Sequence, residues 1–270
     1  MLTPDQKELH IKLEAELYRI RLDPKKDIDR PPSILSVVER KGTTSTYIPV
    51  FSLGDLSLIQ GRQKSKKTYF TSTLVSQMMS KRYKKLHAEP PKETTIAVFD
   101  TEQSDYYAQI TNQRINKLSN SKQEYYYFPM REKNPKERKD LIEFFIRGHK
   151  DKISLLLIDG VVDLLFDFND LKECTLLVQW IMTITKECNV HIVCVLHENQ
   201  GDGKARGHIG TLLAQKAETV LRIEKNATDW SRSTITAKDT RGKQFMDFDI
   251  VIDGNGIPHL TEKEEQAEIF

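Results

Sequence analysis

The chain has few cysteines and lacks long apolar runs. Three cysteines, Cys174, Cys188 and Cys194, occur among its 270 residues, an odd number at spacings that no metal site uses. This usage is typical of a reducing compartment, and the first residues lack the apolar segment of a secretory signal. No run of about 18 apolar residues occurs, so the pattern predicts no membrane-spanning helix. We therefore expect a cytoplasmic protein.

The sequence also lacks a charge excess of either sign. Its 41 basic and 39 acidic residues leave a formal net charge of +2, which neither indicates nor excludes nucleic-acid binding. The charges are unevenly placed, however, because residues 61–92 hold nine basic residues and one acidic residue. A hydrophobic content of 38% is enough for a core and excludes wholesale disorder. We expect a globular protein with a concentrated positive region that suits an anionic ligand.

Residues 3–22 have the pattern of an amphipathic helix. Thr3 is a suitable N-cap, and Pro4 occupies the first helical position. Asp23 and Pro24 end the helix and begin a polar linker that contains further prolines. We place an N-terminal helix and linker at 1–32 and one main domain at 33–270. The apolar residues at helical spacing are Leu9, Leu13, Leu17 and Ile20.

The main domain alternates short apolar runs with helical patterns. Apolar runs occur at 47–51, 56–60, 95–99, 153–158 and 190–196. Helical patterns occur at 68–86, 104–118, 137–149 and 171–187. This alternation predicts an α/β fold with a mostly parallel sheet flanked by helices. The last third of the domain instead predicts antiparallel hairpins, with turns at Arg241-Gly242 and Asp253-Gly254.

The stretch GRQKSKKT, residues 61–68, resembles a phosphate-binding loop of the pattern G-x-x-x-x-G-K-[ST]. Lys67 and Thr68 stand where the motif needs a lysine for phosphate and a hydroxyl for Mg²⁺. Lys66 replaces the second glycine, at a cost of roughly 1 kcal/mol if it adopts a left-handed backbone. A basic surface turn is the alternative interpretation. The predicted nucleotide contacts are Gly61, Arg62, Gln63, Lys64, Ser65, Lys66, Lys67, Thr68 and Tyr69.

Polar residues end three of the predicted strands. Asp159 follows an apolar strand and is positioned to support Mg²⁺ near a phosphate-binding loop. Glu102 and His197 follow two other strands, and a carboxylate there can orient and deprotonate an attacking water. Taken singly, these residues fit a turn, a helix N-terminus and a structural histidine equally well. Together with the loop they favour an ATPase.

This set of segments resembles the RecA-like ATPases, in particular the RepA-type branch encoded by plasmids and other mobile elements. The resemblance covers roughly residues 33–258. It implies that Lys67 and Thr68 bind the phosphates and Mg²⁺ and that Asp159 supports the metal. It also implies that Glu102 is the general base and that His197 couples the γ-phosphate to the loop after it. The matching segments are 61–68, 99–103, 155–160 and 196–211.

The resemblance further implies a homo-oligomer, a hexameric ring or a filament, in which a basic residue reaches the neighbour's nucleotide. Arg206, Lys238 and Arg241 are the candidates for that residue. Residues 199–210 contain four glycines, so we expect a mobile loop that contacts single-stranded DNA through Lys204, Arg206 and His208. A plain flexible surface loop is the alternative. The basic run at 131–139 we interpret as a solvated linker.

The resulting hypothesis is a Mg²⁺-dependent ATPase that moves on or remodels single-stranded DNA, a helicase or accessory ATPase in DNA replication of a mobile element. One alternative is a structural or regulatory protein that binds nucleotide with little hydrolysis, because Lys66 replaces a loop glycine. Another is a kinase-like enzyme with a phosphate-binding loop that acts on a small molecule. The predicted C-terminal hairpins fit the kinase-like alternative poorly.

Overall fold

The computed structural model describes residues 3–80, 82–123, 125–199 and 205–263. The chain divides into two compact units, Met1–Pro31 and Pro32–Phe270. In the first unit, helix α1 (Pro4–Ile20) begins at the predicted cap, where the Thr3 side chain accepts a hydrogen bond from the Gln6 N–H. None of the residues of α1 is buried. No helix within the described ranges is long and apolar enough to span a membrane.

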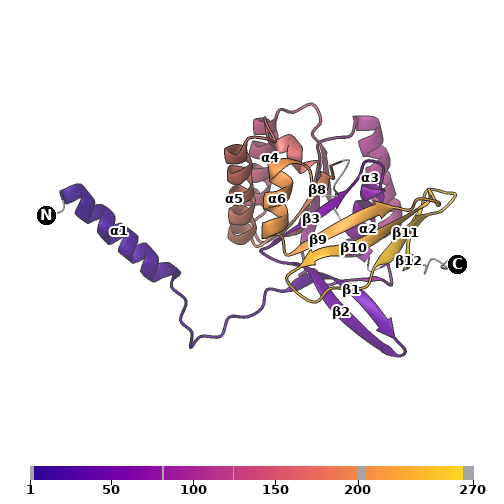
Figure 1. The fold of residues 1–270 in the computed structure, drawn as a ribbon, viewed down its shortest axis with the longest axis horizontal. Helices are drawn as coiled ribbons and strands as arrows, with labels where there is room; N and C mark the ends of the chain where they lie inside the picture. The colour runs from indigo at the N-terminus through magenta and orange to yellow at the C-terminus, as the bar shows by residue number, and fades with distance from the viewer. Residues whose placement is uncertain (1–2, 81, 124, 200–204, 264–270) are drawn as a thin grey trace. The chain divides into compact units, whose positions relative to one another are not determined.

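The second unit is built on a nine-stranded sheet in the order β12-β11-β10-β9-β3-β8-β7-β5-β6 (Figure 1). The strands from β9 to β6 in this order are parallel, and β10, β11 and β12 join them as antiparallel strands. The α/β fold class and the C-terminal hairpins predicted from the sequence are therefore confirmed. The strands are β3 (Leu56–Gly61), β5 (Thr95–Asp100), β6 (Tyr126–Pro129), β7 (Ile153–Asp159), β8 (His191–His197), β9 (Thr219–Lys225), β10 (Arg232–Thr240), β11 (Phe248–Ile252) and β12 (Pro258–Glu262).

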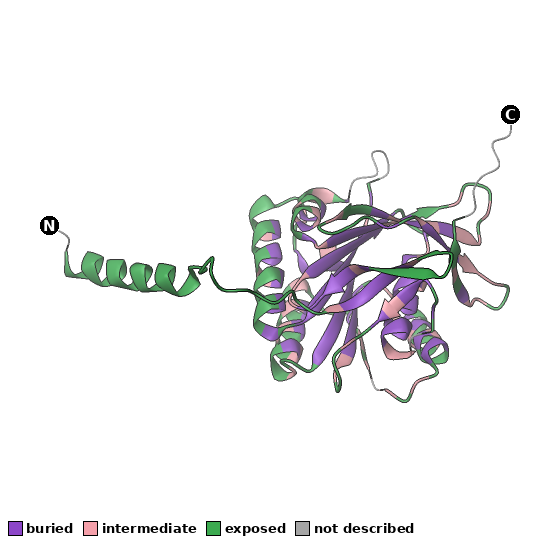
Figure 2. Ribbon diagram, turned by 90° about the horizontal axis from the view of Figure 1, so that it is seen from below, coloured by how far each residue is buried: buried purple, intermediate pink, exposed green. Residues whose placement is uncertain are grey.

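Both faces of the parallel part are covered, as the unbroken apolar runs require. One face packs against α4 (Pro135–Gly148), α5 (Leu171–Cys188) and α6 (Gly207–Lys216). The other packs against α2 (Lys67–Ser80), α3 (Asp105–Ser119) and a small antiparallel sheet. As a result, the central strands are buried along most of their length (Figure 2). The small sheet has the order β2-β1-β4, from β1 (Ser33–Lys41), β2 (Thr44–Ser52) and β4 (Leu86–Ala88), and a short 3₁₀ helix, η1, spans Val161–Leu164.

Three segments differ from the sequence prediction. The helix predicted at 68–86 is shorter, because α2 ends at Ser80 and β4 begins at Leu86. The run at 131–139 is not a solvated linker, because α4 begins at Pro135 with Asn134 as its cap. Arg138 is buried and donates to the carbonyls of Met130, Arg131 and Asp163. Within 199–210, the part from Gly207 onward is the first turn of α6, and Gly210 packs against Ala205. A charged run and a glycine-rich run therefore both contain helix N-termini anchored by tertiary contacts.

The fold places the ends of four parallel strands side by side. In register, Gly61 at the end of β3 lies opposite His197 at the end of β8. Asp159 at the end of β7 lies opposite Asp100 at the end of β5. Since the carboxyl ends of parallel strands share one edge of a sheet, the loops after these strands form a single site.

Candidate active site

The loop between β3 and α2 is tight and leaves no room for a side chain at Gly61. A Cβ there would lie 2.5 Å from the Ile223 carbonyl oxygen. Lys66 has φ of 70°, in the left-handed region where the motif has its second glycine. Its ammonium turns toward β10, 3.4 Å from the Arg232 carbonyl and 3.5 Å from the Ser233 hydroxyl. The loop thus adopts a glycine-type backbone at residue 66 despite the lysine.

Lys67 is buried at the start of α2, and acceptors occupy all three of its ammonium protons. Its Nζ lies 3.0 Å from the carbonyl oxygens of Gly61 and Arg62 and 2.9 Å from Nδ1 of His197. Burial lowers the pKa of Lys67, and the nearby carboxylates of Asp159 and Glu102 oppose that shift. A phosphate that binds Lys67 must therefore replace at least one of these acceptors.

The contact with Lys67 fixes the proton on His197. An ammonium only donates, so Nδ1 accepts and the ring proton lies on Nε2. That nitrogen is 3.3 Å from a carboxylate oxygen of Glu102. The hydrogen bond from His197 lowers the pKa of Glu102, with a smaller contribution from the charge of Lys67. The predicted phosphate lysine, sensor and base therefore form one continuous chain, with Glu102 ionised at neutral pH.

Asp159 is buried, and no donor among the described residues forms a hydrogen bond to its carboxylate. Burial, together with the charges of Glu102 and Asp100, raises its pKa to about 8, and the charge of Lys67 opposes this rise. A buried carboxylate without a donor fits a site that receives a cation. Thr68 adds a hydroxyl that forms no hydrogen bond within the described residues, where only the Thr68 carbonyl accepts side-chain hydroxyls. Both are oxygen ligands of the kind that Mg²⁺ prefers.

A metal at this position would need ligands from outside the protein. Within the described ranges, no group of three or more His, Cys, Asp or Glu side chains is arranged to hold a metal ion. Mg²⁺ commonly takes one or two protein oxygens and completes its shell with phosphate and water. Thr68 and Asp159 therefore fit Mg²⁺ bound together with a nucleotide.

Three residues that sequence reasoning missed join the loop to the neighbouring strands. Glu198 is buried, and its backbone N–H donates to the Gly61 carbonyl. Its carboxylate accepts from the Gln60 amide at 2.7 Å and from Arg222 Nε at 2.8 Å. The end of β8 is thus tied to both β3 and β9. The only sequence signal was a glutamate directly after a strand, which does not reveal its partners.

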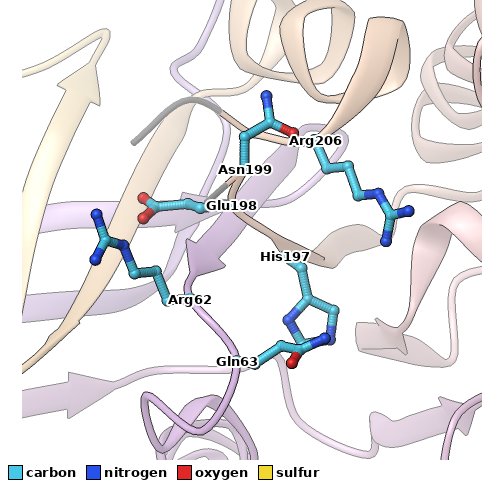
Figure 3. Close-up of a pocket in the computed structure, with 6 residues that line it drawn as sticks. All are labelled: Arg62, Gln63, His197, Glu198, Asn199 and Arg206. Carbon is cyan, nitrogen blue, oxygen red and sulfur yellow. The ribbon is translucent and has the colours of Figure 1, made fainter. Parts of the chain in front are cut away.

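A cavity of about 590 Å³ opens beside His197 and Glu198 (Figure 3). Arg206 lines it, stacks over the Phe168 ring at 4.6 Å, and donates its backbone N–H to the His197 carbonyl. His208 is exposed in the first turn of α6. Lys204, the third predicted DNA contact, lies outside the described residues. The lining comes from the loop after β3, the end of β8 and the start of α6: Arg62, Gln63, His197, Glu198, Asn199 and Arg206.

The other predicted nucleotide contacts on the loop do not take part in the contacts among Lys67, His197 and Glu102. The side chains of Arg62, Gln63 and Lys64 are exposed at the loop, whereas Ser65 is buried and its hydroxyl has no hydrogen-bond partner among the described residues. The ring of Tyr69 packs under the guanidinium of Arg114, 4.0 Å away.

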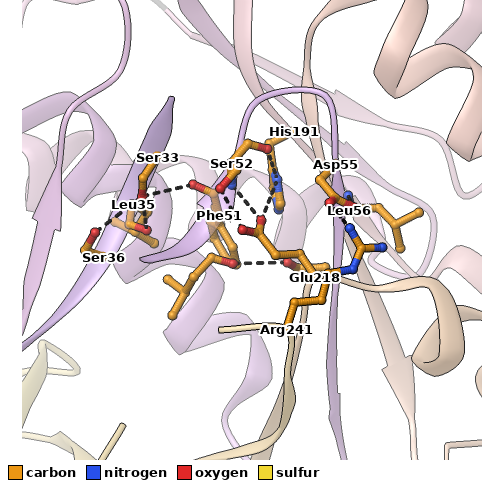
Figure 4. A network of polar contacts seen from close by, with 12 residues as sticks. Ser33, Leu35, Ser36, Phe51, Ser52, Asp55, Leu56, His191, Glu218 and Arg241 are labelled. Carbon is orange, nitrogen blue, oxygen red and sulfur yellow. Dashed lines mark hydrogen bonds and ion pairs between the residues drawn. The ribbon is translucent and has the colours of Figure 1, made fainter. Parts of the chain in front are cut away.

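Two of the basic residues predicted to reach the nucleotide of a neighbouring subunit, Arg241 and Lys238, lie outside the 61–68 loop. Arg241 forms an ion pair with Asp55, which precedes β3, and donates to the Lys216 carbonyl (Figure 4). It is therefore at the edge of the sheet opposite to Gly61. Lys238, on β10, lines a hollow of about 320 Å³ beside α6. Gln60, the residue before Gly61, and Ala205 line the same hollow.

No protein-family model and no curated protein matches this sequence. Among solved structures, the chain is similar to the one described as the crystal structure of the RadB recombinase, with a TM-score of 0.53 and 14% sequence identity. The similarity covers 80% of this chain and 94% of that chain. An identity this low shows the fold alone. The fold is RecA-like, as the sequence predicted.

Proposed function

We propose that this protein is a Mg²⁺-dependent ATP hydrolase of the RecA-like type. One observation carries the proposal: Lys67, His197 and Glu102 form a continuous chain at the edge of the sheet where Asp159 also ends its strand. A phosphate-binding lysine, a polar sensor, an ionised carboxylate and a buried metal-supporting aspartate are the groups that ATP hydrolysis requires. The RecA-like fold supports the same activity.

In this mechanism, the chain's own residues bind phosphate, orient water and accept a proton. Lys67 transfers its hydrogen bonds from the loop carbonyls and His197 to the β- and γ-phosphates. Glu102, ionised because His197 donates to it, orients the attacking water and accepts its proton. Thr68 and Asp159 would hold Mg²⁺, which when bound neutralises the phosphate charge. His197 loses its Lys67 contact when phosphate arrives and so transmits occupancy to Arg206, whose backbone N–H donates to the His197 carbonyl.

The direct test is phosphate release with ATP and Mg²⁺ by the parent chain and by Lys67→Ala. We expect turnover by the parent and none by the variant, because the ammonium is the only described cation at the centre of the chain of contacts. Lys92→Ala is the matched control, since Lys92 is an exposed lysine outside the 61–68 loop. Parental turnover by Lys67→Ala would reject the site assignment.

We further propose that the protein acts on single-stranded DNA, as a helicase or accessory ATPase of a mobile element. The four sequence segments that resemble the RepA-type branch motivate this proposal, and exposed Arg206 beside the cavity supports it. Single-stranded DNA should stimulate phosphate release by the parent. Arg206→Ala should lose this stimulation, whereas Lys216→Ala, at the far end of the same helix, should keep it. A structural or regulatory nucleotide-binding protein would show no stimulation.

The proposed assembly is a ring or filament in which a cation from one subunit completes the site of the next. Sizing in solution with an ATP analogue and DNA should then give a mass of several subunits. Mixing two inactive variants distinguishes the candidate cations. A Lys67→Ala subunit still supplies the cation, and a subunit that lacks the cation still supplies Lys67, so a site between them is complete. If Arg241 is that cation, Arg241→Ala alone should be inactive and should regain turnover when mixed with Lys67→Ala. Two inactive variants that stay inactive on mixing would exclude Arg241.

A further inference from the structure

Asp100, at the end of β5, has a fully buried carboxylate that accepts four hydrogen bonds. One oxygen accepts the backbone N–H groups of Glu102 at 3.1 Å and Gln103 at 3.0 Å. The other accepts the Gln103 side-chain amide and the Tyr127 hydroxyl, both at 2.6 Å. Buried carboxylates are costly unless donors satisfy them, and here every donor comes from the turn after β5 or from the neighbouring strand.

The saturation of Asp100 separates it from the other acidic residues of the site. No lysine, arginine or histidine within the described ranges forms an ion pair with it. Its two oxygens have no free acceptor direction, and its side chain is 0% exposed. It is therefore suited neither to bind a metal nor to accept a proton from water. Asp159, by contrast, has no donor within the described residues.

The two backbone bonds determine where Glu102 points. They hold consecutive N–H groups of residues 102 and 103 on one carboxylate oxygen, so the backbone around Glu102 has a fixed direction. From that backbone, the Glu102 side chain reaches His197, 3.3 Å away. A loss of these bonds would release the turn and the direction of the base together.

Two further residues anchor the carboxylate on either side. Tyr127 on β6 must donate to Asp100, and burial together with the Asp100 charge raises the pKa of the phenol, so it keeps its proton. The Gln103 amide oxygen accepts from Thr111 on α3 at 3.1 Å. The turn is thus connected to β6 and to α3.

We propose that Asp100 is a positioning residue that holds Glu102 in its catalytic direction, with Gln103 and Tyr127 as its supports. The role rests on the proposed ATP hydrolysis and adds three residues to it. What Asp100 contributes to Glu102 is position, not charge. An asparagine at position 100 can retain the position of Glu102, because its carbonyl oxygen can still accept both backbone N–H groups. The Gln103 amide can reverse, so that its oxygen accepts from the asparagine amide.

The test compares Asp100→Ala with Asp100→Asn in phosphate release, nucleotide affinity and thermal unfolding. Asp100→Ala should lower kcat roughly 10- to 100-fold, the effect of a base misplaced by about 1 Å. Nucleotide affinity should stay within about twofold of the parent, because the described hydrogen bonds of the Asp100 carboxylate come from Glu102, Gln103 and Tyr127 and none from the 61–68 loop. Asp100→Asn should recover most of the lost kcat. Equal loss in both variants would mean that the charge acts directly and would overturn the proposal.

Tyr127→Phe provides a second test if Asp100→Ala fails to fold. It removes one of the four donors and should lower kcat roughly three- to tenfold at unchanged nucleotide affinity. Tyr126→Phe is the matched control, since the Tyr126 hydroxyl forms no hydrogen bond within the described residues. Parental kcat in both Tyr127→Phe and Gln103→Ala would overturn the positioning role alone. A parent chain that releases no phosphate would instead overturn the proposed function and this role with it.

Discussion

Nδ1 of His197 lies 2.9 Å from the ammonium of Lys67. This contact joins the end of β8 to the first residue of α2, and it makes His197 an acceptor toward Lys67 and a donor toward Glu102. The group proposed to bind phosphate and the group proposed to activate water are therefore coupled through one imidazole. Any change at His197 should affect both partners.

Asparagine and glutamine at position 197 separate the two contacts. His197→Asn places an acceptor near the former Nδ1 and loses the donor to Glu102, whereas His197→Gln keeps a donor near the former Nε2. Because His197 lowers the pKa of Glu102, its loss should raise that pKa. The acidic limb of the kcat–pH profile should then move to higher pH in His197→Asn and stay near the parental position in His197→Gln. Identical profiles in all three proteins would contradict the assigned donor.

Lys66 should store backbone strain that glycine releases. Its φ of 70° costs an L-residue roughly 1 kcal/mol, and the contacts of its ammonium, at 3.4 and 3.5 Å, are long. Lys66→Gly should therefore unfold in urea with a free energy about 1 kcal/mol higher than Lys66→Ala, since both lack the ammonium. Lys92 has no positive φ, so the free energy of unfolding of Lys92→Gly should be equal to or below that of Lys92→Ala. Equal stability at position 66 would contradict the assigned strain.

His191 predicts a loss of stability in mild acid. It is fully buried, its Nδ1 donates to the Ser52 carbonyl at 2.7 Å, and its Nε2 has no partner in the described part of the chain (Figure 4). Burial lowers its pKa from 6.5 to about 4. The unfolded chain therefore binds the proton more readily. The contribution of neutral His191 is complete above pH 6.5 and decreases as the pH falls toward 4.

At pH 5 this residue should lower the free energy of unfolding by about 2 kcal/mol relative to pH 7.5. Glu218, 4.0 Å away, has a pKa raised by burial and changes stability in the opposite direction. It remains in both proteins, so urea unfolding of the parent and of His191→Gln at the two pH values isolates the histidine. A pH dependence that is the same in both would contradict its buried neutral state.

The sequence was most informative where chemistry follows a strand. Apolar runs before Gly61, Asp159 and His197 predicted buried parallel strands, and such strands necessarily end at the same edge. That rule alone brings Lys67, Glu102 and His197 together, although it gives no distances. Helix α1 was equally predictable, because its cap and proline are local signals.

Contacts between distant residues could not be predicted in this way. Asp100 and Tyr127 meet because β5 and β6 are parallel neighbours, and Glu198 reaches Arg222 only because β9 lies beside β3. These pairings depend on strand order, which hydrophobic periodicity does not specify. Gly160 is a further case: with φ of 95°, it leaves no space for a Cβ beside Thr101. One glycine after a strand does not indicate such crowding.

The central claim is that Glu102 activates the water that attacks ATP. Glu102→Gln keeps the shape of the side chain and an acceptor for His197 but cannot take a proton at neutral pH. The most direct measurement is the single-turnover rate of phosphate release with Mg²⁺ and ATP, taken beside nucleotide affinity. We predict that Glu102→Gln binds ATP within about threefold of the parent and releases phosphate roughly 100-fold or more slowly. Phosphate release by Glu102→Gln at the parental rate would contradict the account.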